Sequence, residues 1–330
     1  MDIHGKALRL GVTAVLCAVA LRLSLAGIPE KVLSRMTQPD IAAFLIYLET
    51  GRDVRRSPSR QVFSPEFAPE SAAPMAAQPD PLPVFSPEDA KSLEVYYACT
   101  SRPDLGEALD APLAWDLTAP EPTVLILHTH TTESYTKQTE DYKETASWRT
   151  LDEGYNMLSI GDALGRLLAR EGITAVHDRQ IHDYPSYNGS YNHARKAISD
   201  YLKEYPSIRL VLDLHRDAAD TGSGQLRPLV TLDGIPTARL MLGLGTGDGG
   251  LSHPNWKENL ALAAKLHTQL ERQAPGITRP LLLRSQRFNQ DLHPGALLVE
   301  VGAAGNTHAE ALAAAQQLGL AIAALARGSE

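Results

Sequence analysis

The sequence predicts an α/β fold: a mostly parallel central sheet covered by helices on both faces. Two observations lead to this class. Short apolar segments suited to buried strands alternate along residues 93–330 with longer segments of helical periodicity. The strand candidates are also apolar almost throughout, which is typical of a sheet that is buried on both faces.

Each element of this fold can be placed on the chain. Strands are expected at 123–127, 173–177, 208–214, 227–232, 238–244, 280–284 and 296–301. Helices are expected at 154–171, 189–204, 255–273 and 307–327, and Gly172 is a natural stop for the first of them. Ligands bind such sheets at the carboxyl ends of strands, so the site is expected just after residues 127, 214 and 301.

The first 92 residues predict a different organisation. Residues 1–27 place Lys6 and Arg9 before an apolar run, which indicates a single-pass membrane anchor, with a cleaved signal peptide as the alternative. Residues 28–56 contain a short amphipathic helical segment. Residues 57–92 form a linker, because 57–87 holds eight prolines and no apolar periodicity. The domain at 93–330 is then expected on the extracytoplasmic side of the cell membrane.

Composition excludes several classes of function. The formal net charge of −8 makes nucleic acid an unexpected partner. The two cysteines, Cys17 and Cys99, form no C-x-x-C pair, which excludes a cysteine-based zinc site. The sequence lacks the G-x-S-x-G signature of serine hydrolases. The glycines of 245–250 match a dinucleotide-binding pattern formally, but the next helix begins too late for that use.

Histidines and carboxylates gather at the three expected strand ends. The segments are HTHTTES at 128–134, DLHRD at 213–217 and LLVEVG at 297–302. Zinc hydrolases use two or three His or carboxylate ligands, and a further carboxylate moves the proton. Taken singly, each motif is also compatible with polar surface residues or an ion-pair network. Glu300 lies inside an apolar strand, where a carboxylate needs a partner such as a cation.

Several longer segments resemble the stage II sporulation protein P family. They are ILHTHTTESY, GYNMLSIGDALGRLLAREGITAVHDRQIHDYPSYNGSY, LVLDLHRDA and RFNQDLHPGALLVEVG, followed by Asn306-Thr307 and Glu310-Ala311. The resemblance runs in order from about residue 95 to 325. It implies a zinc-dependent peptidoglycan hydrolase with an amidase-3-like fold. The implied activity is that of an N-acetylmuramoyl-L-alanine amidase and stem-peptide endopeptidase, acting in engulfment during sporulation with the stage II sporulation proteins D and M.

The resemblance also implies roles for residues. Glu300 is expected as the catalytic carboxylate, and His130, Glu133 and His215 as the Zn²⁺ ligands. The amidase-3 pattern matches His130 rather than His128, while Asp152 or Glu153 competes with Glu133 as the carboxylate ligand. His128 is expected to orient its neighbours or contact substrate, because residues two apart in an extended segment face the same way. Arg216 is expected to steady the carboxylates or an anionic substrate.

Two other readings stay open on the sequence. One is a wall-binding or scaffold module without turnover. The other is a metallocarboxypeptidase, which would need a cationic pocket for a terminal carboxylate.

Overall fold

The computed structural model describes residues 59–67 and 84–327, apart from residues 114, 139–141, 147, 220 and 223. The chain divides into two compact units, and the second, Ser59–Glu330, contains every described residue. The predicted membrane anchor and juxtamembrane segment lie outside the described residues, as does 68–83 of the predicted linker.

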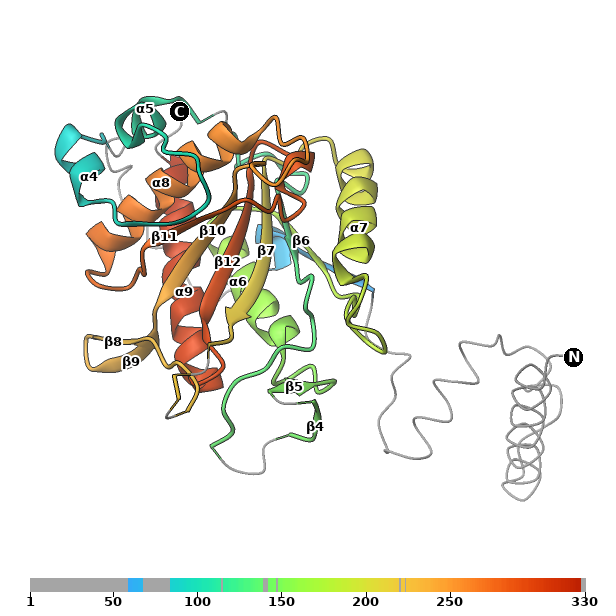
Figure 1. Cartoon of the computed structure of the whole chain (residues 1–330). Helices are drawn as coiled ribbons and strands as arrows, with labels where there is room; N and C mark the ends of the chain where they lie inside the picture. The colour runs from blue at the N-terminus through green and yellow to red at the C-terminus, as the bar shows by residue number, and fades with distance from the viewer. Residues whose placement is uncertain are drawn as a thin grey trace, which may run out of the picture. The chain divides into compact units, whose positions relative to one another are not determined.

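An eight-stranded sheet forms the centre of the described unit, in the order β1-β6-β3-β7-β12-β10-β11-β2 (Figure 1). The pairs β1–β6 and β10–β12 are antiparallel and the other pairs are parallel. The strands are β1 (Arg60–Phe63), β2 (Val95–Ala98), β3 (Val124–Leu127), β6 (Ala175–Asp178), β7 (Leu210–Asp217), β10 (Leu240–Gly245), β11 (Leu281–Arg284) and β12 (Ala296–Ala303). The mostly parallel sheet confirms the predicted fold class.

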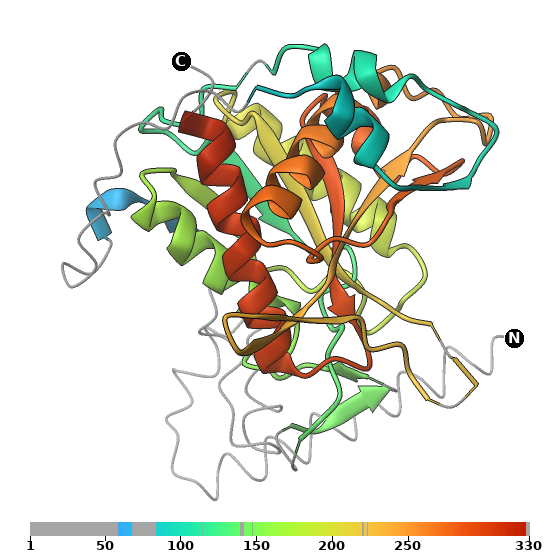
Figure 2. The ribbon, with the colours of Figure 1, turned by 90° about the vertical axis from the view of Figure 1, so that its left-hand side faces the viewer.

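Helices cover both faces of this sheet, as predicted. Figure 2 shows α6 (Met157–Arg170), α8 (Trp256–Gln273) and α9 (His308–Arg327) lying together on one face. Their apolar residues form the larger core cluster with one face of the strands. On the opposite face α7 (Ser190–Glu204) packs against β3, β6 and β7 in a second, smaller cluster. These four helices correspond to the four that the periodicity predicts.

Several elements of the structure were not predicted from the sequence. The strand β1 and the helix α4 (Pro87–Ser92) lie inside the predicted linker. Proline content suggested a spacer there, but Phe63 of β1 is buried against α6, where a Cβ on Gly165 would lie 2.3 Å from the Phe63 ring. The folded unit therefore begins before the predicted boundary. Further elements not predicted are β2, α5 (Leu105–Asp110), the β4–β5 pair (Glu144–Ala146, Arg149–Thr150), the strand β9 (Ile235–Ala238) paired with β8 (Leu229–Leu232), and the short 3-10 turns at Pro65–Phe67 and Gln290–Leu292.

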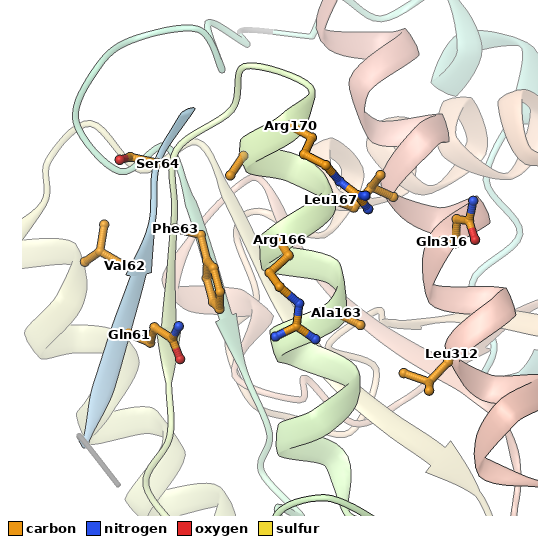
Figure 3. Close-up of a pocket in the computed structure, with 11 residues that line it drawn as sticks. Gln61, Val62, Phe63, Ser64, Ala163, Arg166, Leu167, Arg170, Leu312 and Gln316 are labelled. Atoms are coloured by element: carbon orange, nitrogen blue, oxygen red, sulfur yellow. The ribbon is translucent and has the colours of Figure 1, made fainter. Parts of the chain in front are cut away.

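A hollow of about 520 Å³ lies between β1, α6 and α9 (Figure 3). Arg166 and Arg170 of α6 extend along it, with Leu312 and Gln316 of α9 on its other side. Neither arginine forms an ion pair within the part of the chain that the structure describes. The hollow contains no histidine or carboxylate in its lining, so it lacks the groups expected for catalysis.

Among the described helices, α9 is long and apolar enough to span a membrane by length and composition. Most of its apolar residues are buried against α6, α8 and the sheet. This is the environment of a core helix in the folded domain. It neither supports nor contradicts the predicted N-terminal anchor.

Candidate functional site

Side chains from three strand ends meet in one pocket of about 180 Å³. The sheet register sets Leu127 of β3 beside Asp213 of β7, and Glu300 of β12 beside His215 of β7. The pocket is lined by His130, Glu133, Tyr191, His215, Arg216, Asp217, Ala218, Gly243, Leu282, Arg284, Phe288, Leu298 and Glu300. The pocket thus brings together every predicted site residue except His128.

A turn after β3 directs His130 into this pocket. Asp213 fixes the turn, because its carboxylate accepts hydrogen bonds from the Thr129 amide at 2.7 Å and the Thr129 hydroxyl at 2.6 Å. The His130 ring stacks on Tyr187 with centroids 4.5 Å apart, and its Nε2 lies 3.0 Å from the Tyr187 hydroxyl. Burial lowers the pKa of His130 to about 4, so the imidazole is neutral at neutral pH, as a metal ligand must be.

His128 faces a different set of residues. Its Nδ1 lies 3.1 Å from the Leu214 carbonyl oxygen, and its Nε2 lies 2.8 Å from Nε2 of His177. The expectation that His128 and His130 point into one site assumed an extended backbone, but the strand ends at Leu127 and the two side chains separate. His128 has no place in the pocket lining, so the structure does not support substrate contact there. Its contact with the backbone just before His215 is compatible with the predicted orienting role.

Arginines surround the carboxylate of Glu133. Arg149 lies 3.3 Å and Arg216 lies 3.6 Å from its Oε1, while Oε2 accepts a hydrogen bond from the Arg216 amide at 3.2 Å. Burial alone would raise the pKa of Glu133, but Arg216 and His215 outweigh it and lower the pKa to about 2. Arg216 also donates to the carbonyl oxygens of Ser134 and Trp148. It therefore steadies Glu133 and the surrounding loop, as one of its two predicted roles requires.

His215 lies between two carboxylates. Its Nδ1 is 3.5 Å from Glu133 Oε2, and its Nε2 is 2.9 Å from Asp213 Oδ1, although this second contact is not aligned as a hydrogen bond. Burial opposes a charge on the ring, yet Asp213 and Glu133 together hold the pKa of His215 well above its usual value. The ring is therefore protonated. The same two carboxylates would also stabilise a metal cation at this position.

Glu300 extends from β12 into the same pocket. Its Oε2 is buried and has no hydrogen-bond partner within the described chain. Burial raises the pKa of Glu300 to about 8, and the nearby Glu133 and Asp217 add to that rise, while His215 and Arg216 oppose it. A buried carboxyl oxygen without a partner within the described chain is unfavourable for stability, which is typical of a functional rather than a structural residue.

The two rivals to Glu133 as carboxylate ligand lie elsewhere. Glu153 forms an ion pair with Arg179 at 2.6 Å, and Asp152 accepts a hydrogen bond from the Gly154 amide in the turn before α6. Neither is part of the pocket lining. The geometry therefore favours Glu133, whose own assignment as a ligand stays a prediction.

The donor set in the pocket has the chemistry of a zinc site. His130, Glu133 and His215 supply two imidazoles and a carboxylate, and the rings of His130 and His215 lie 5.2 Å apart between centroids. Within the described residues, however, no three His, Cys, Asp or Glu side chains are arranged closely enough to hold an ion together. The residue types therefore fit a zinc site. Their spacing is wider than a bound ion requires, because Glu133 faces arginines and His130 faces Tyr187.

Several residues that line the pocket or contact its lining residues were not singled out from the sequence. Tyr187 and Tyr191 come from the loop before α7 and from α7 itself, Arg149 from β5, and Arg284 from the end of β11. Phe288 belongs to RFNQDLHPGALLVEVG, one of the segments that carry the family resemblance. Only the strand-end rule could have found Arg284, because it follows the apolar run at 281–283 directly.

The fold and the pocket define an α/β domain with a histidine–carboxylate site at the strand ends. A family model described as Stage II sporulation protein P matches residues 70–323, which is more than half of the chain. The chain therefore belongs to the stage II sporulation protein P family. This confirms the family that the sequence motifs indicated.

Individual relatives agree with this assignment. The stage II sporulation protein P of Bacillus subtilis (strain 168) is 28% identical over 197 residues, which cover 56% of this chain and 46% of that protein. The chain thus spans about half the length of this curated relative.

Solved structures found by shape are more distant. They include the N-acetylmuramoyl-L-alanine amidase AmiC2 of Nostoc punctiforme and an N-acetylmuramoyl-L-alanine amidase from Clostridium difficile 630, each 14% identical. The TM-scores are 0.34 and 0.35, with 62% of this chain and 94% of each structure covered. A likeness at this level supports no conclusion about chemistry.

Proposed function

We propose that this protein is a zinc-dependent peptidoglycan hydrolase. Its proposed activity is that of an N-acetylmuramoyl-L-alanine amidase, with stem-peptide endopeptidase activity in addition. In this proposal it is anchored in the cell membrane by its N-terminal segment, with the domain on the extracytoplasmic side. It acts there in engulfment together with the stage II sporulation proteins D and M. Membership of the family supports the sporulation context.

One observation carries the enzymatic proposal. Glu300 has a buried carboxyl oxygen without a partner among the described residues, and it shares a pocket with His130, Glu133 and His215 at adjoining strand ends. A pure binding module has no need of a carboxyl group whose pKa is raised to about 8. Near neutral pH such a group exists in both protonation states, as a residue that accepts and returns a proton requires.

Each residue has a defined part in the proposed reaction. His130, Glu133 and His215 would hold the zinc ion, and a bound zinc ion would supply an acidified water molecule and polarise the amide carbonyl. Glu300 accepts the water proton and delivers it to the leaving nitrogen. Tyr187 and Asp213 orient the two imidazoles through the contacts described above, and Arg149 and Arg216 hold Glu133 in place.

The test is the Glu300→Ala variant of the full chain on purified wall sacculi. Loss of the acid–base group is expected to lower the cleavage rate by about 10²–10⁴-fold. Bound zinc and the unfolding midpoint are expected to stay at wild-type values, because Glu300 is not a proposed ligand. Mass spectrometry of the released muropeptides identifies the bond that is broken. Cleavage at the wild-type rate by the variant would refute the role of Glu300, and no cleavage by the wild type would favour a binding module.

A further inference from the structure

Arg284 faces the pocket from the side opposite Glu300. In β11 the side chains of Leu281 and Leu283 enter the larger core cluster, so Leu282 and Arg284 point to the other face of the sheet. Both of these residues line the pocket. Arg284 is an exposed residue, so it lines the same cavity as the proposed catalytic groups while remaining accessible to solvent.

The charge of Arg284 is not neutralised by its surroundings. The pocket's other arginine, Arg216, is occupied by Glu133 and by two backbone carbonyl groups. Within the described part of the chain, the Arg284 side chain forms no ion pair and no hydrogen bond. Its backbone carbonyl accepts from Thr246, which fixes the end of the strand but leaves the side chain free. A free guanidinium in a pocket is a binding group for an anion.

The floor of the pocket leaves room for a ligand between Glu300 and Arg284. Gly243 of β10 lies between them, in register with Leu298 on one side and with Leu282 on the other. Because Gly243 has no side chain, the floor there is bare backbone, and an added Cβ would approach Leu298 to 3.1 Å. Tyr191 and Phe288, with ring centroids 6.2 Å apart, supply an aromatic wall.

The sheet register gives the length of this path. Glu300 pairs with Met241, and Arg284 pairs with Gly245, four residues further along β10. Two strand spacings and four residues of extended chain separate the two Cα atoms by about 17 Å. Both side chains line the pocket. If each covers about 3–5 Å of the gap, the remaining span corresponds to roughly two to four residues of an extended peptide.

We propose that Arg284 binds a free carboxylate of the substrate peptide, two to four residues away from the bond that is cleaved at Glu300. The planar guanidinium group would pair with both carboxylate oxygens, as arginine does with planar anions. The pocket would then select peptides that carry an acidic group at this distance over neutral peptides of the same length. This inference rests on the proposed hydrolase function and names a determinant of its specificity.

The test compares two ligands and two side chains. The ligands are a soluble N-acetylmuramoyl tripeptide with free carboxyl groups and the same compound with those groups amidated. Binding is measured by calorimetry on the full chain carrying Glu300→Gln, so that the ligand is not consumed. Arg284→Gln is expected to weaken binding of the free acid by about ten- to a hundredfold, because a hydrogen-bonded charge pair is lost. For the amidated ligand, Arg284→Gln is expected to change the affinity by less than about twofold. Amidation has already removed the charge with which Arg284 pairs, so both changes remove the same interaction.

Turnover provides a second readout in the chain with Glu300 intact. Arg284→Gln is expected to raise KM for the free acid at an unchanged kcat, and Arg284→Lys is expected to recover part of the loss. The matched control is Arg166→Gln, which removes an arginine from the separate hollow of Figure 3. It is expected to change neither binding nor KM.

Three results would overturn the assignment of Arg284. They are equal effects of Arg284→Gln on the free and amidated ligands, no effect on either, and no measurable binding of the free acid when Arg284 is present. The failure of the proposed function is a distinct result. It would show as no turnover of any ligand by the wild type, and the binding comparison would still decide the role of Arg284.

Discussion

Two clusters of nearly the same composition flank the end of β3. The open cluster, defined as His130, Glu133, His215 and Arg216, lines the pocket with Glu300 beside it. The closed cluster, defined as His128, His177, Asp162 and Arg179, lies behind the strand next to α6. In the closed cluster His177 Nδ1 is 2.9 Å from Asp162, and Arg179 pairs with Asp162 at 2.5 Å. Each cluster holds two histidines, a carboxylate and an arginine.

The difference lies in what remains unsatisfied. Every ring nitrogen of the closed cluster has a partner within hydrogen-bond distance, and burial lowers the pKa of both His128 and His177. The open cluster faces a cavity and adjoins the Glu300 carboxyl oxygen, which has no partner in the part of the chain that the structure describes. Residue types alone therefore do not distinguish a structural cluster from a reactive one. Access to a cavity and an unsatisfied polar group do distinguish them.

Replacing His130 of the open cluster is expected to give the largest effect and tests the distinction between the two clusters most directly. His130→Ala removes a proposed zinc ligand, so zinc affinity is expected to fall by more than about 100-fold, beyond the loss typical of supporting residues. Cleavage of wall sacculi is expected to fall at least as far. The measurement is bound zinc per chain after dialysis, with circular dichroism to show that the fold is kept. Full zinc occupancy in His130→Ala would remove this residue from the ligand set.

Replacing the closed-cluster histidine is expected to act on stability instead. His128→Ala leaves Nε2 of His177 without its partner and opens a cavity between β3 and α6, at a cost of about 2–4 kcal/mol in the free energy of unfolding. Urea unfolding measures this cost, and zinc content is expected to stay near the wild-type value. The division between the clusters would be reversed if His128→Ala lost zinc while its unfolding free energy was unchanged.

The sequence predicted the open cluster better than it predicted the split between His128 and His130. The four long helices and most of the buried central strands follow from apolar periodicity. The strand-end rule located residues 130, 133, 215 and 300 together. The turn after Leu127 depends on the hydrogen bond from Thr129 to Asp213, which lies 84 residues after Thr129, so no local pattern could reveal it. The partners Tyr187 and Arg149 are likewise brought in by tertiary packing. β1 was missed because a four-residue strand next to prolines carries almost no periodic signal.

A glycine on α6 offers a milder way to disturb the closed cluster. A Cβ added to Gly161 would lie 2.5 Å from Nε2 of His177 and 2.7 Å from Nε2 of His128, closer than the two rings can tolerate without moving. Alanine gains about 1 kcal/mol of helix propensity over glycine, so the expected net cost of Gly161→Ala is about 1–3 kcal/mol. Urea unfolding is again the measurement.

The reason for this cost can be checked by a double variant. In a His177→Ala background the clash with the ring is gone, so adding Gly161→Ala is expected to be neutral or stabilising. An equal cost of Gly161→Ala in both backgrounds would mean that the histidine pair is not what the glycine accommodates.

Acid titration gives the smallest effect and separates the closed cluster from the rest of the fold. Burial alone would raise the pKa of Asp162, but hydrogen bonds from His177 and Arg179 outweigh it and hold the pKa below its ordinary value. A lowered pKa means that ionised Asp162 stabilises the fold above its unfolded-state pKa of about 3.9, and that this contribution is lost as the pH falls through the folded-state value. At pH 7 the wild type is therefore expected to exceed Asp162→Asn by about 1 kcal/mol in unfolding free energy, with the difference shrinking below about pH 4. Asp200→Asn, which removes an exposed partner of Lys196, is the control and is expected to show a much smaller pH-dependent difference, because solvent screens this exposed pair. A gap between wild type and Asp162→Asn that stayed constant from pH 7 to pH 3 would show that the closed cluster is held by packing rather than by its charges.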